Sequence, residues 1–365
     1  MRLSFLEPLY TESGPFASVY LDTSRDTEHP DRAIALRWRR LRADLTRQGA
    51  DRAVLGVLEE AVGADVELPG VHGQAIFAAN GSLVMEGELA RPPARDSARY
   101  STLPDAMPLV SQHLPEIPYL AVVVHYGGLP TATAHGWVTV EAESGTWPAS
   151  NVTPGERLHH RVPVASWHQS AVRLGHQLDA WMRRSHGDAV VVAGDEWAGN
   201  VLVRRLPHAL RDKVVRVGGP TPTDTRRALL EPQLDAVFLG RLAAHDQDLV
   251  NIFIGRRALG GPVTEGLAAT VAALQRSQVA ALLLNNPPGS SLRLWTGPQP
   301  TQLALSEEEL VSFGVRAPRE ERADDALVRA LVGTAAELVV VPESALKLDE
   351  GVGALLRYTH PWAPL

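Results

Sequence analysis

The sequence predicts an α/β protein built from three domains, and three observations support this prediction. The chain has 365 residues, and at roughly 150 residues per domain this length favours two or three domains. Short β-prone runs alternate with stretches of helical periodicity, which is typical of an α/β layer with a partly parallel sheet. A stretch rich in proline, residues 91–118, predicts a long irregular connection that ends a first domain. We therefore predict domains at residues 1–117, 118–258 and 259–365.

Composition and charge exclude several classes of protein. The chain contains no cysteine, which excludes disulfides, thiolate zinc sites and a cysteine nucleophile. Its formal net charge of -7 argues against a protein that coats DNA or RNA by charge alone, but it leaves room for local RNA contacts. We find no signal peptide at the N-terminus and no run of about 18 apolar residues. We expect a soluble cytoplasmic protein that binds neither a membrane nor DNA.

The first domain combines strands with two helices. A strand is predicted at residues 16–21 and helices at 31–48 and 52–62. The longer helix has an apolar stripe whose spacings of four, three and four place one face inward; its members are Ile34, Trp38, Leu41 and Leu45. Two apolar runs flank Asn80-Gly81 and predict a hairpin, because both turn residues must accept positive φ.

The second and third domains alternate strands and helices. In the second, a helix begins at Ser166 and ends near residue 185, with Leu174, Leu178 and Trp181 inward. Its other predicted elements are strands at 119–125, 134–141, 189–194 and 214–217, a loop at 144–163 and a helix at 224–249. In the third, the predicted elements are helices at 264–276, 307–313 and 322–332 and strands at 279–284, 338–341 and 351–358.

The sequence offers only weak candidates for a catalytic motif. The glycine turn at 193–199 carries Asp195 and Glu196 where an anion would lie, so we interpret it as a tight turn followed by the acidic start of a helix. No Gly-x-Ser-x-Gly elbow is present. Four histidines fall within one loop and the helix after it, and they leave open a metalloenzyme as a third hypothesis; they are His159, His160, His168 and His176.

Two basic surfaces are candidates for RNA contact. The helix at 31–48 carries six arginines against two aspartates, a net charge of +4, and we place Arg37, Arg40 and Arg47 broadly together. They either form a solvated face or bind phosphates. The predicted loop carries the second surface, with Trp167 beside it as a stacking ring; its members are Arg157, His159, His160 and Arg161. An ordinary solvated loop is the alternative.

The C-terminal segment carries the most specific pattern. The run Gly351-Val352-Gly353-Ala354-Leu355-Leu356-Arg357-Tyr358 resembles the end of the third domain of archaeo-eukaryotic class-one release factors and Pelota. The middle segment is similar to their central domain in the order of its elements, and residues 18–23 resemble the bacterial branch of this superfamily. The chain also resembles an actinobacterial group related to the ribosome hibernation factor Balon. The resemblance implies three domains, of which the central and C-terminal ones are α/β sandwiches.

One departure from that family bears on activity. Release factors carry a Gly-Gly-Gln tripeptide before a helix of the central domain, and the matching stretch here is residues 165–170, with Trp167 and His168 in place of the glycines and Gln169 retained. Glycines allow the backbone to approach an ester and to stabilise developing charge. We therefore expect no peptidyl-tRNA hydrolysis and no catalytic residue. An Asn-Ile-Lys-Ser codon-reading motif is also absent from the first segment.

The resemblance implies a translation-silencing factor that occupies the ribosomal A site, as in hibernation of dormant or stressed cells. Its partners would be ribosomal RNA of the decoding and peptidyl-transferase centres and, by the same resemblance, elongation factor Tu. It implies no cofactor and no metal. The residues expected to contact RNA are Arg157, His159, His160, Arg161, Trp167, His168, Gln169, Arg37, Arg40 and Arg47. The alternative is a peptidyl-tRNA hydrolase or tRNA endonuclease of the same superfamily, with Gln169 as its catalytic residue.

Overall fold

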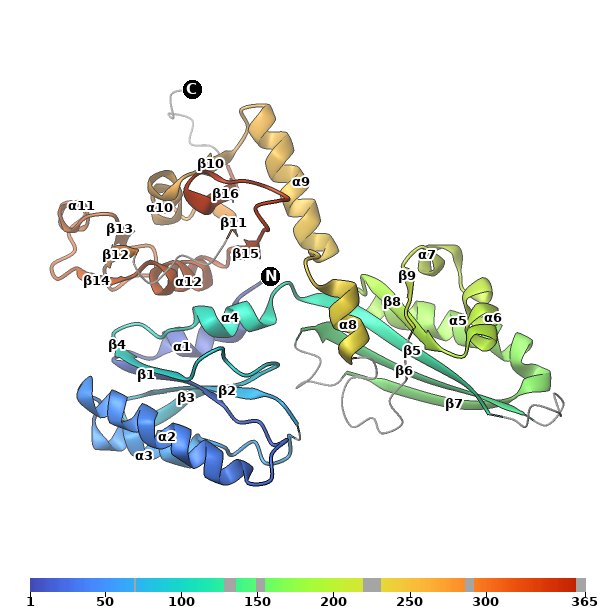
Figure 1. The fold of residues 1–365 in the computed structure, drawn as a ribbon. Coiled ribbons are helices and arrows are strands. Elements are labelled where there is room, and N and C mark those ends of the chain that lie inside the picture. Colours follow the sequence, from blue (N-terminus) through green and yellow to red (C-terminus); the bar gives the residue numbers. More distant parts are fainter. Residues whose placement is uncertain (69, 128–135, 149–154, 219–230, 286–291, 359–365) are drawn as a thin grey trace. The chain divides into compact units, whose positions relative to one another are not determined.

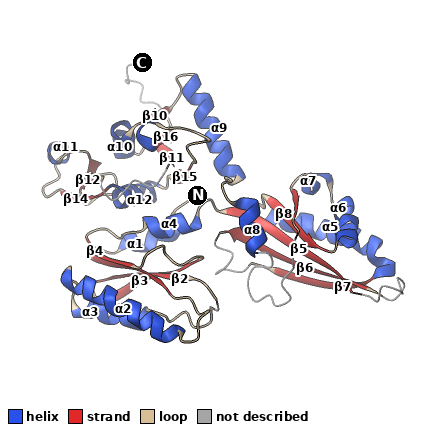
Figure 2. Cartoon of the chain, in the orientation of Figure 1, coloured by secondary structure: helices blue, strands red, loops and turns tan. Residues whose placement is uncertain are grey.

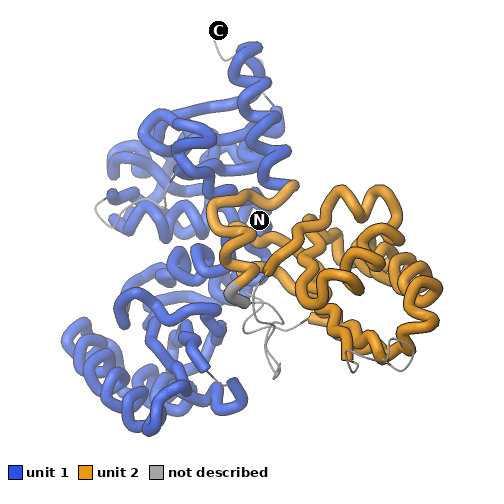
Figure 3. The backbone as a smooth tube through the Cα atoms, turned by 45° about the vertical axis from the view of Figure 1, so that its right-hand side comes forward, with its two compact units in different colours: residues 1–114, 245–365 blue, residues 115–244 orange. Residues whose placement is uncertain are grey.

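The computed structural model describes residues 1–365 except 69, 128–135, 149–154, 219–230, 286–291 and 359–365. It divides into two compact units, which Figure 3 shows in different colours. Unit 1 contains residues 1–114 and 245–365, and unit 2 contains residues 115–244. Among the described residues, no helix has both the length and the apolar character that crossing a bilayer requires.

The N-terminal part of unit 1 is a four-stranded antiparallel sheet with helices on both faces (Figures 1 and 2). The strand order is β3-β2-β1-β4. Its elements are α1 (Glu7–Thr11), β1 (Phe16–Asp22), α2 (Pro30–Arg47), α3 (Arg52–Ala61), β2 (Gly73–Ala79), β3 (Ser82–Leu89), β4 (Ser97–Ser101) and α4 (Met107–His113). The predicted connection at 91–118 is wrong in part, because it contains β4 and α4.

The predicted apolar stripe and hairpin of this part are confirmed. Ile34, Trp38, Leu41 and Leu45 of α2 are buried against β1, β2 and α3 in one core. Between β2 and β3, Asn80 has a φ of 52° and Gly81 a φ of 74°. Both residues thus adopt the positive φ that a two-residue hairpin turn requires.

The C-terminal part of unit 1 contains two sheets, ordered β10-β16-β11-β15 and β13-β12-β14. β11 and β15 are parallel, and β16 runs antiparallel between β10 and β11. The elements are α9 (Ala244–Ala258), β10 (Val263–Glu265), α10 (Leu267–Gln275), β11 (Val279–Leu284), β12 (Arg293–Thr296), β13 (Leu303–Ala304), α11 (Glu307–Ser312), β14 (Arg319–Arg322), α12 (Ala323–Thr334), β15 (Glu337–Val340) and β16 (Val352–Leu356). The sequence analysis missed β12, β13 and β14 and extended α10 over β10.

One hydrophobic core joins the two parts of unit 1. It combines Leu6, Leu9 and Phe77 with α12 residues such as Leu327 and with Leu338 of β15. The N-terminal ammonium also donates to the Leu338 carbonyl at 3.0 Å and pairs with buried Asp246 of α9 at 3.3 Å. The structure therefore divides the chain after residues 114 and 244, not into the three predicted segments, since the first and third segments share one core and α9 packs with the third.

Unit 2 is a five-stranded mixed sheet with the order β7-β6-β5-β8-β9. β5, β8 and β9 are parallel, whereas β6 and β7 run antiparallel to their neighbours. Helices α5 and α6 pack on one face, and α8 packs on the other. The elements are β5 (Ile117–Gly127), β6 (Trp137–Trp147), β7 (Arg157–Pro163), α5 (Trp167–Arg184), β8 (Ala189–Gly194), α6 (Glu196–Arg205), α7 (His208–Arg211), β9 (Val214–Arg216) and α8 (Glu231–Phe238).

Two predictions for this segment are wrong. The predicted loop at 144–163 contains the end of β6 and all of β7. The predicted helix at 224–249 is two helices, because α8 ends at Phe238 and α9 begins at Ala244; residues 224–230 lie outside the described residues. The inward face of α5 is confirmed, with Leu174, Leu178 and Trp181 buried. The α/β class of the chain is likewise confirmed.

Candidate nucleic-acid interface

Aromatic and cationic side chains gather at the end of the unit 2 sheet where β5 and β8 end. Gly127 at the end of β5 pairs with Trp137 at the start of β6, and Trp137 pairs with Pro163 at the end of β7. Helix α5 begins four residues after Pro163, and α6 follows directly after β8. We name the group at this end the strand-end site; its members are Tyr126, Trp137, Arg161, His168 and Trp197.

On the sheet face that packs against α5 and α6, the Trp197 ring contacts two other rings of the strand-end site. The Tyr126 and Trp197 ring centroids lie 6.1 Å apart with an interplanar angle of 82°. The His168 and Trp197 centroids lie 6.3 Å apart at 84°. Edge-to-face geometry of this kind is favourable for aromatic pairs. Trp197 nevertheless remains 45% exposed, so the cluster presents an indole to solvent.

A cation–π pair occupies the opposite face at the same end. The Arg161 guanidinium carbon lies 4.9 Å from the Trp137 ring centroid, a distance at which the ring quadrupole attracts the cation. Trp137 is 41% exposed. Within the part of the chain that the structure describes, no carboxylate forms an ion pair with Arg161, so its charge is available to an external anion.

The turn between β8 and α6 fixes the position of Trp197. Gly194 has a φ of 97°, and a Cβ there would lie 2.1 Å from the Val124 carbonyl oxygen. The Asp195 carboxylate accepts a hydrogen bond of 2.8 Å from the Ala198 amide and caps α6. The prediction of a tight turn with helix-capping acids is therefore confirmed.

Trp167 does not belong to this surface, and its predicted role as a stacking ring is wrong. Its side chain is fully buried, and its indole Nε1 donates to the Ala198 carbonyl oxygen at 3.2 Å. The residue thus anchors the first turn of α5 to α6. The next two residues, His168 and Gln169, are exposed in the first turn of α5, and their contact with RNA stays a prediction.

The predicted basic loop is the edge strand β7, and two of its four basic residues lie near carboxylates of β6. Arg157 Nη2 lies 3.3 Å from Glu143 Oε1, and His159 Nε2 lies 3.9 Å from Glu141 Oε1 on the neighbouring strand. His160 is half-buried, with its neighbours in sequence exposed, as strand alternation requires. Arg161 is the one member of this predicted patch that joins the strand-end site.

Two of the three arginines predicted to lie together on α2 are paired with aspartates. Arg37 is half-buried and pairs with Asp22 at 2.6 Å, and Arg47 pairs with Asp44 one turn earlier. Arg40 is exposed and, among the described residues, has no ion-pair partner. Acidic neighbours therefore neutralise much of the net positive charge counted on this helix.

The four histidines of the metalloenzyme hypothesis are not brought together. Within the described residues, the group whose ligand atoms lie close enough to share a cation is Asp105, Asp324 and Asp325 in unit 1. Arg322 lies 3.4 Å from Asp105 and also pairs with Asp324, and Arg99 pairs with Asp325. These carboxylates are thus part of a buried ion-pair network with two arginines. Burial raises the pKa of Asp325 to about 8, against the opposing effect of Arg99.

The sequence analysis missed three members of the strand-end site: Tyr126, Trp137 and Trp197. Tyr126 follows the predicted buried strand, and Trp197 lies within the glycine turn that was considered only for phosphate binding. Their signal was an aromatic residue at the end of a strand or the start of a helix. Antiparallel pairing of β5 with β6 and parallel pairing of β5 with β8 bring these positions to one end of the sheet, which local patterns do not reveal.

Two uncharacterized proteins of Mycobacterium tuberculosis, from strains CDC 1551 / Oshkosh and ATCC 25618 / H37Rv, are each 27% identical over 376 residues, or 98% of this chain and 97% of the relative. The crystal structure of the archaeal termination factor aRF1 is 15% identical, covers 97% of this chain and 96% of that one, and has a TM-score of 0.24. Archaeoglobus fulgidus Pelota is 13% identical, with 79% and 80% covered and a TM-score of 0.38.

The family model that matches is that of Bacterial archaeo-eukaryotic release factor family 2, over residues 118–258. The match contains every element of unit 2 from β6 to α8 and all five members of the strand-end site. The central segment of this chain is therefore similar to the bacterial archaeo-eukaryotic release factor family.

Proposed function

We propose that the protein binds the ribosome through the strand-end site and silences translation by occupying the A site without cleaving peptidyl-tRNA. The observation that carries this proposal is the pair of exposed indoles, Trp137 and Trp197, at the end of the release-factor-like unit that also carries Gln169. In this proposal the strand-end site faces ribosomal RNA near the peptidyl-transferase centre.

The chemistry of the site suits unpaired RNA bases. Single-stranded nucleotides stack on aromatic rings and on arginine planes, and each stacked base contributes roughly 1–3 kcal/mol. Trp197, with Tyr126 and His168 against it, presents a supported ring, and Arg161 over Trp137 presents a cation beside a second ring. A chain of net charge -7 requires such local contacts, because its overall charge repels RNA.

The first turn of α5 argues against ester hydrolysis. Trp167 and His168 stand where release factors have glycines, and the Trp167 side chain is fixed in the core. A Trp and a His in helical backbone cannot reproduce the close approach that two glycines allow. The amide of Gln169 lies in the same helix, so its orientation follows α5.

The finer assignment, a hibernation factor of dormant or stressed cells, rests on the family resemblance. In that assignment the N-terminal part of unit 1, with exposed Arg40, faces the decoding centre. The C-terminal part faces ribosomal protein or elongation factor Tu.

The test is co-sedimentation of the full chain with 70S ribosomes from stationary cells. We expect binding at low salt and a loss of roughly tenfold or more in affinity when Trp137 and Trp197 are both replaced by alanine. Leu239→Ala is the matched control, since Leu239 is 72% exposed in the same unit but lies outside the strand-end site. Failure of the wild-type chain to sediment, or equal affinity of the double variant, would falsify the proposal.

The hydrolase alternative rests on one observation, the exposure of Gln169 beside the strand-end site. Incubation with ribosomes loaded with peptidyl-tRNA separates the two functions. We expect no release above background. Release that disappears in Gln169→Ala would replace silencing with hydrolysis as the function of this surface.

A further inference from the structure

We propose a second site at the opposite end of unit 2, a pocket that binds a nucleoside 5′-phosphate, with the phosphate on Lys213 and Arg183 and the base on an apolar wall. The pocket lies between the last turn of α5, the start of β8 and the α7–β9 connection, and its volume is about 340 Å³. Volumes of this order hold small organic ligands. The site shares no residue with the strand-end site.

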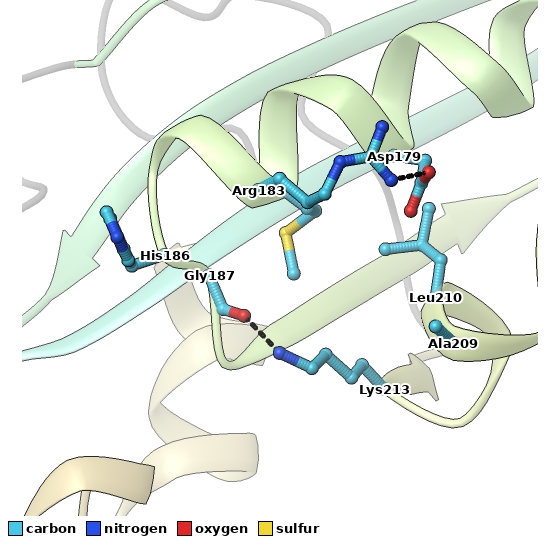
Figure 4. Close-up of a pocket in the computed structure, with 8 residues that line it drawn as sticks. Asp179, Arg183, His186, Gly187, Ala209, Leu210 and Lys213 are labelled. Atoms are coloured by element: carbon cyan, nitrogen blue, oxygen red, sulfur yellow. Dashed lines mark hydrogen bonds and ion pairs between the residues drawn. The ribbon is translucent and has the colours of Figure 1, made fainter.

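Lys213 supplies a positioned ammonium. Its Nζ donates to the Gly187 carbonyl oxygen at 2.7 Å, as Figure 4 shows. An ammonium group has three N–H donors, so this bond fixes the side chain and leaves two donors for an anion. Lys213 is one of only two lysines in the chain, which has 33 arginines.

Arg183 supplies the second cation from the α5 side of the pocket. Its guanidinium pairs with Asp179 one turn earlier, and in Figure 4 this pair and the Lys213–Gly187 pair lie on different sides of the pocket. Only one of its nitrogens is engaged in that pair, and the remaining N–H donors suit a phosphate group. The Asp179 pair therefore orients Arg183 and leaves it able to bind an anion.

One wall of the pocket is apolar. Met182 and Leu210 are buried, whereas Ala209 of α7 is exposed at the pocket. The Met182 side chain can occupy this position because residue 187 is a glycine; a Cβ there would lie 2.4 Å from the Met182 sulfur. A thioether packs favourably against an aromatic ring. The apolar wall can therefore contact a base, whereas a phosphate ion alone would not need such a wall.

The surrounding charge favours a phosphate. Basic residues lie in the last turns of three helices that end on this side of the sheet, and they are Arg183, Arg184, Arg204, Arg205 and Arg211. The acidic groups are Asp179, Asp188, Asp212 and Glu156; Asp179 pairs with Arg183, Asp212 with His208 and Glu156 with Arg184, and Asp188 accepts from the Ala244 amide. Each of these acids is thus engaged, while Lys213 retains two donors toward the pocket.

The experiment is calorimetric titration of the full chain with AMP, adenosine and inorganic phosphate. We expect AMP to bind, and adenosine and phosphate to bind at least about tenfold more weakly, because each lacks one half of the ligand. A parallel titration with a 5′-phosphorylated dinucleotide tells whether the source is RNA or a free nucleotide, since tighter binding of the dinucleotide favours RNA. Equal affinity for phosphate and AMP would overturn the nucleotide assignment in favour of a simple anion site.

Two variants test the pocket by different routes. Ala209→Phe fills the cavity from an exposed helix position without changing charge, and Lys213→Gln removes the ammonium; each is expected to weaken AMP binding by about tenfold. Arg204→Gln is the matched control, because it removes an exposed cation of α6 that does not line the pocket. Unchanged AMP binding in Ala209→Phe, with the fold intact by circular dichroism, would overturn the site. Displacement of AMP by an acidic peptide at equal affinity would show a protein-binding pocket instead.

Discussion

The two ends of the unit 2 sheet expose different side chains, and the difference follows from the direction of two helices. α5 and α6 both begin where β5 and β8 end, and both end at the start of the parallel strands. Their first turns carry rings and the acidic cap Asp195, and their last turns carry arginine pairs. The helix dipole favours acids at the first turn and bases at the last. The strand-end site and the basic pocket therefore lie at opposite ends of the unit 2 sheet.

The comparison also separates two tryptophans of the strand-end region. Trp167 begins α5 and is fully buried, whereas Trp197 lies in the first turn of α6 and is 45% exposed. They are 30 residues apart in the chain but connected through Ala198, which accepts the Trp167 indole hydrogen bond. One tryptophan stabilises the end of the unit, and the other is free to contact a partner.

The largest expected effect is on the free energy of unfolding when each of these two tryptophans is replaced by alanine. Trp167→Ala removes a buried indole and its hydrogen bond and should lower the free energy of unfolding by about 3–5 kcal/mol. Trp197→Ala should change it by less than about 1 kcal/mol, since the ring is half exposed. Urea unfolding of the full chain, followed by circular dichroism, measures both. Similar losses in the two variants would contradict the assignment of Trp167 as the structural residue.

The second expected effect concerns the turn that presents Trp197. Gly194→Ala places a Cβ 2.1 Å from the Val124 carbonyl at a φ of 97°, and the strain should cost about 1–3 kcal/mol of stability. Gly218→Ala is the control, because a Cβ at Gly218 meets no atom within 4 Å. The same unfolding measurement applies. Wild-type stability of Gly194→Ala would mean that the β8–α6 turn differs from the one described.

A smaller effect is expected at the helix cap. Asp195→Ala removes the acceptor of the Ala198 amide and should cost about 1 kcal/mol. Asp195→Asn keeps an acceptor oxygen and should restore most of that stability. If both variants were equally destabilised, the loss would come from the charge of Asp195 near the helix dipole and not from the hydrogen bond.

Much of the fold could be predicted, because helix periodicity is a local property. The stripes of α2 and α5 and the hairpin at Asn80 depend on residues close in sequence. The burial of Trp167 could also have been predicted from the sequence. Continuing the α5 stripe backward from Leu178 and Leu174 places residue 167 on the inward face, since seven residues are close to two helical turns.

Other features depend on contacts that sequence patterns do not contain. The shared core of unit 1 needs Leu6 and Leu9 to pack against residues more than 300 positions away. Strand β7 was hidden because its alternation mixes Leu158, His160 and Val162 with charged residues, so its inward face is only partly apolar. The strand-end site requires the parallel pairing of β5 with β8, and tertiary topology supplies that pairing.

The smallest expected effect distinguishes the strand-end site from the whole of β7 as the proposed RNA contact. Arg161 has a ring beneath it and, within the described residues, no ion-pair partner, whereas Arg157 pairs with Glu143. Arg161→Gln should therefore weaken ribosome binding by a few fold and reduce the slope of log affinity against log salt by about 0.7–0.9, the effect of one phosphate contact. Arg157→Gln should leave that slope unchanged, because its charge is already compensated inside the sheet. Co-sedimentation at a series of salt concentrations measures both slopes. Equal reductions in the two variants would spread the interface along β7, and a reduction in Arg157→Gln alone would move it away from the strand end.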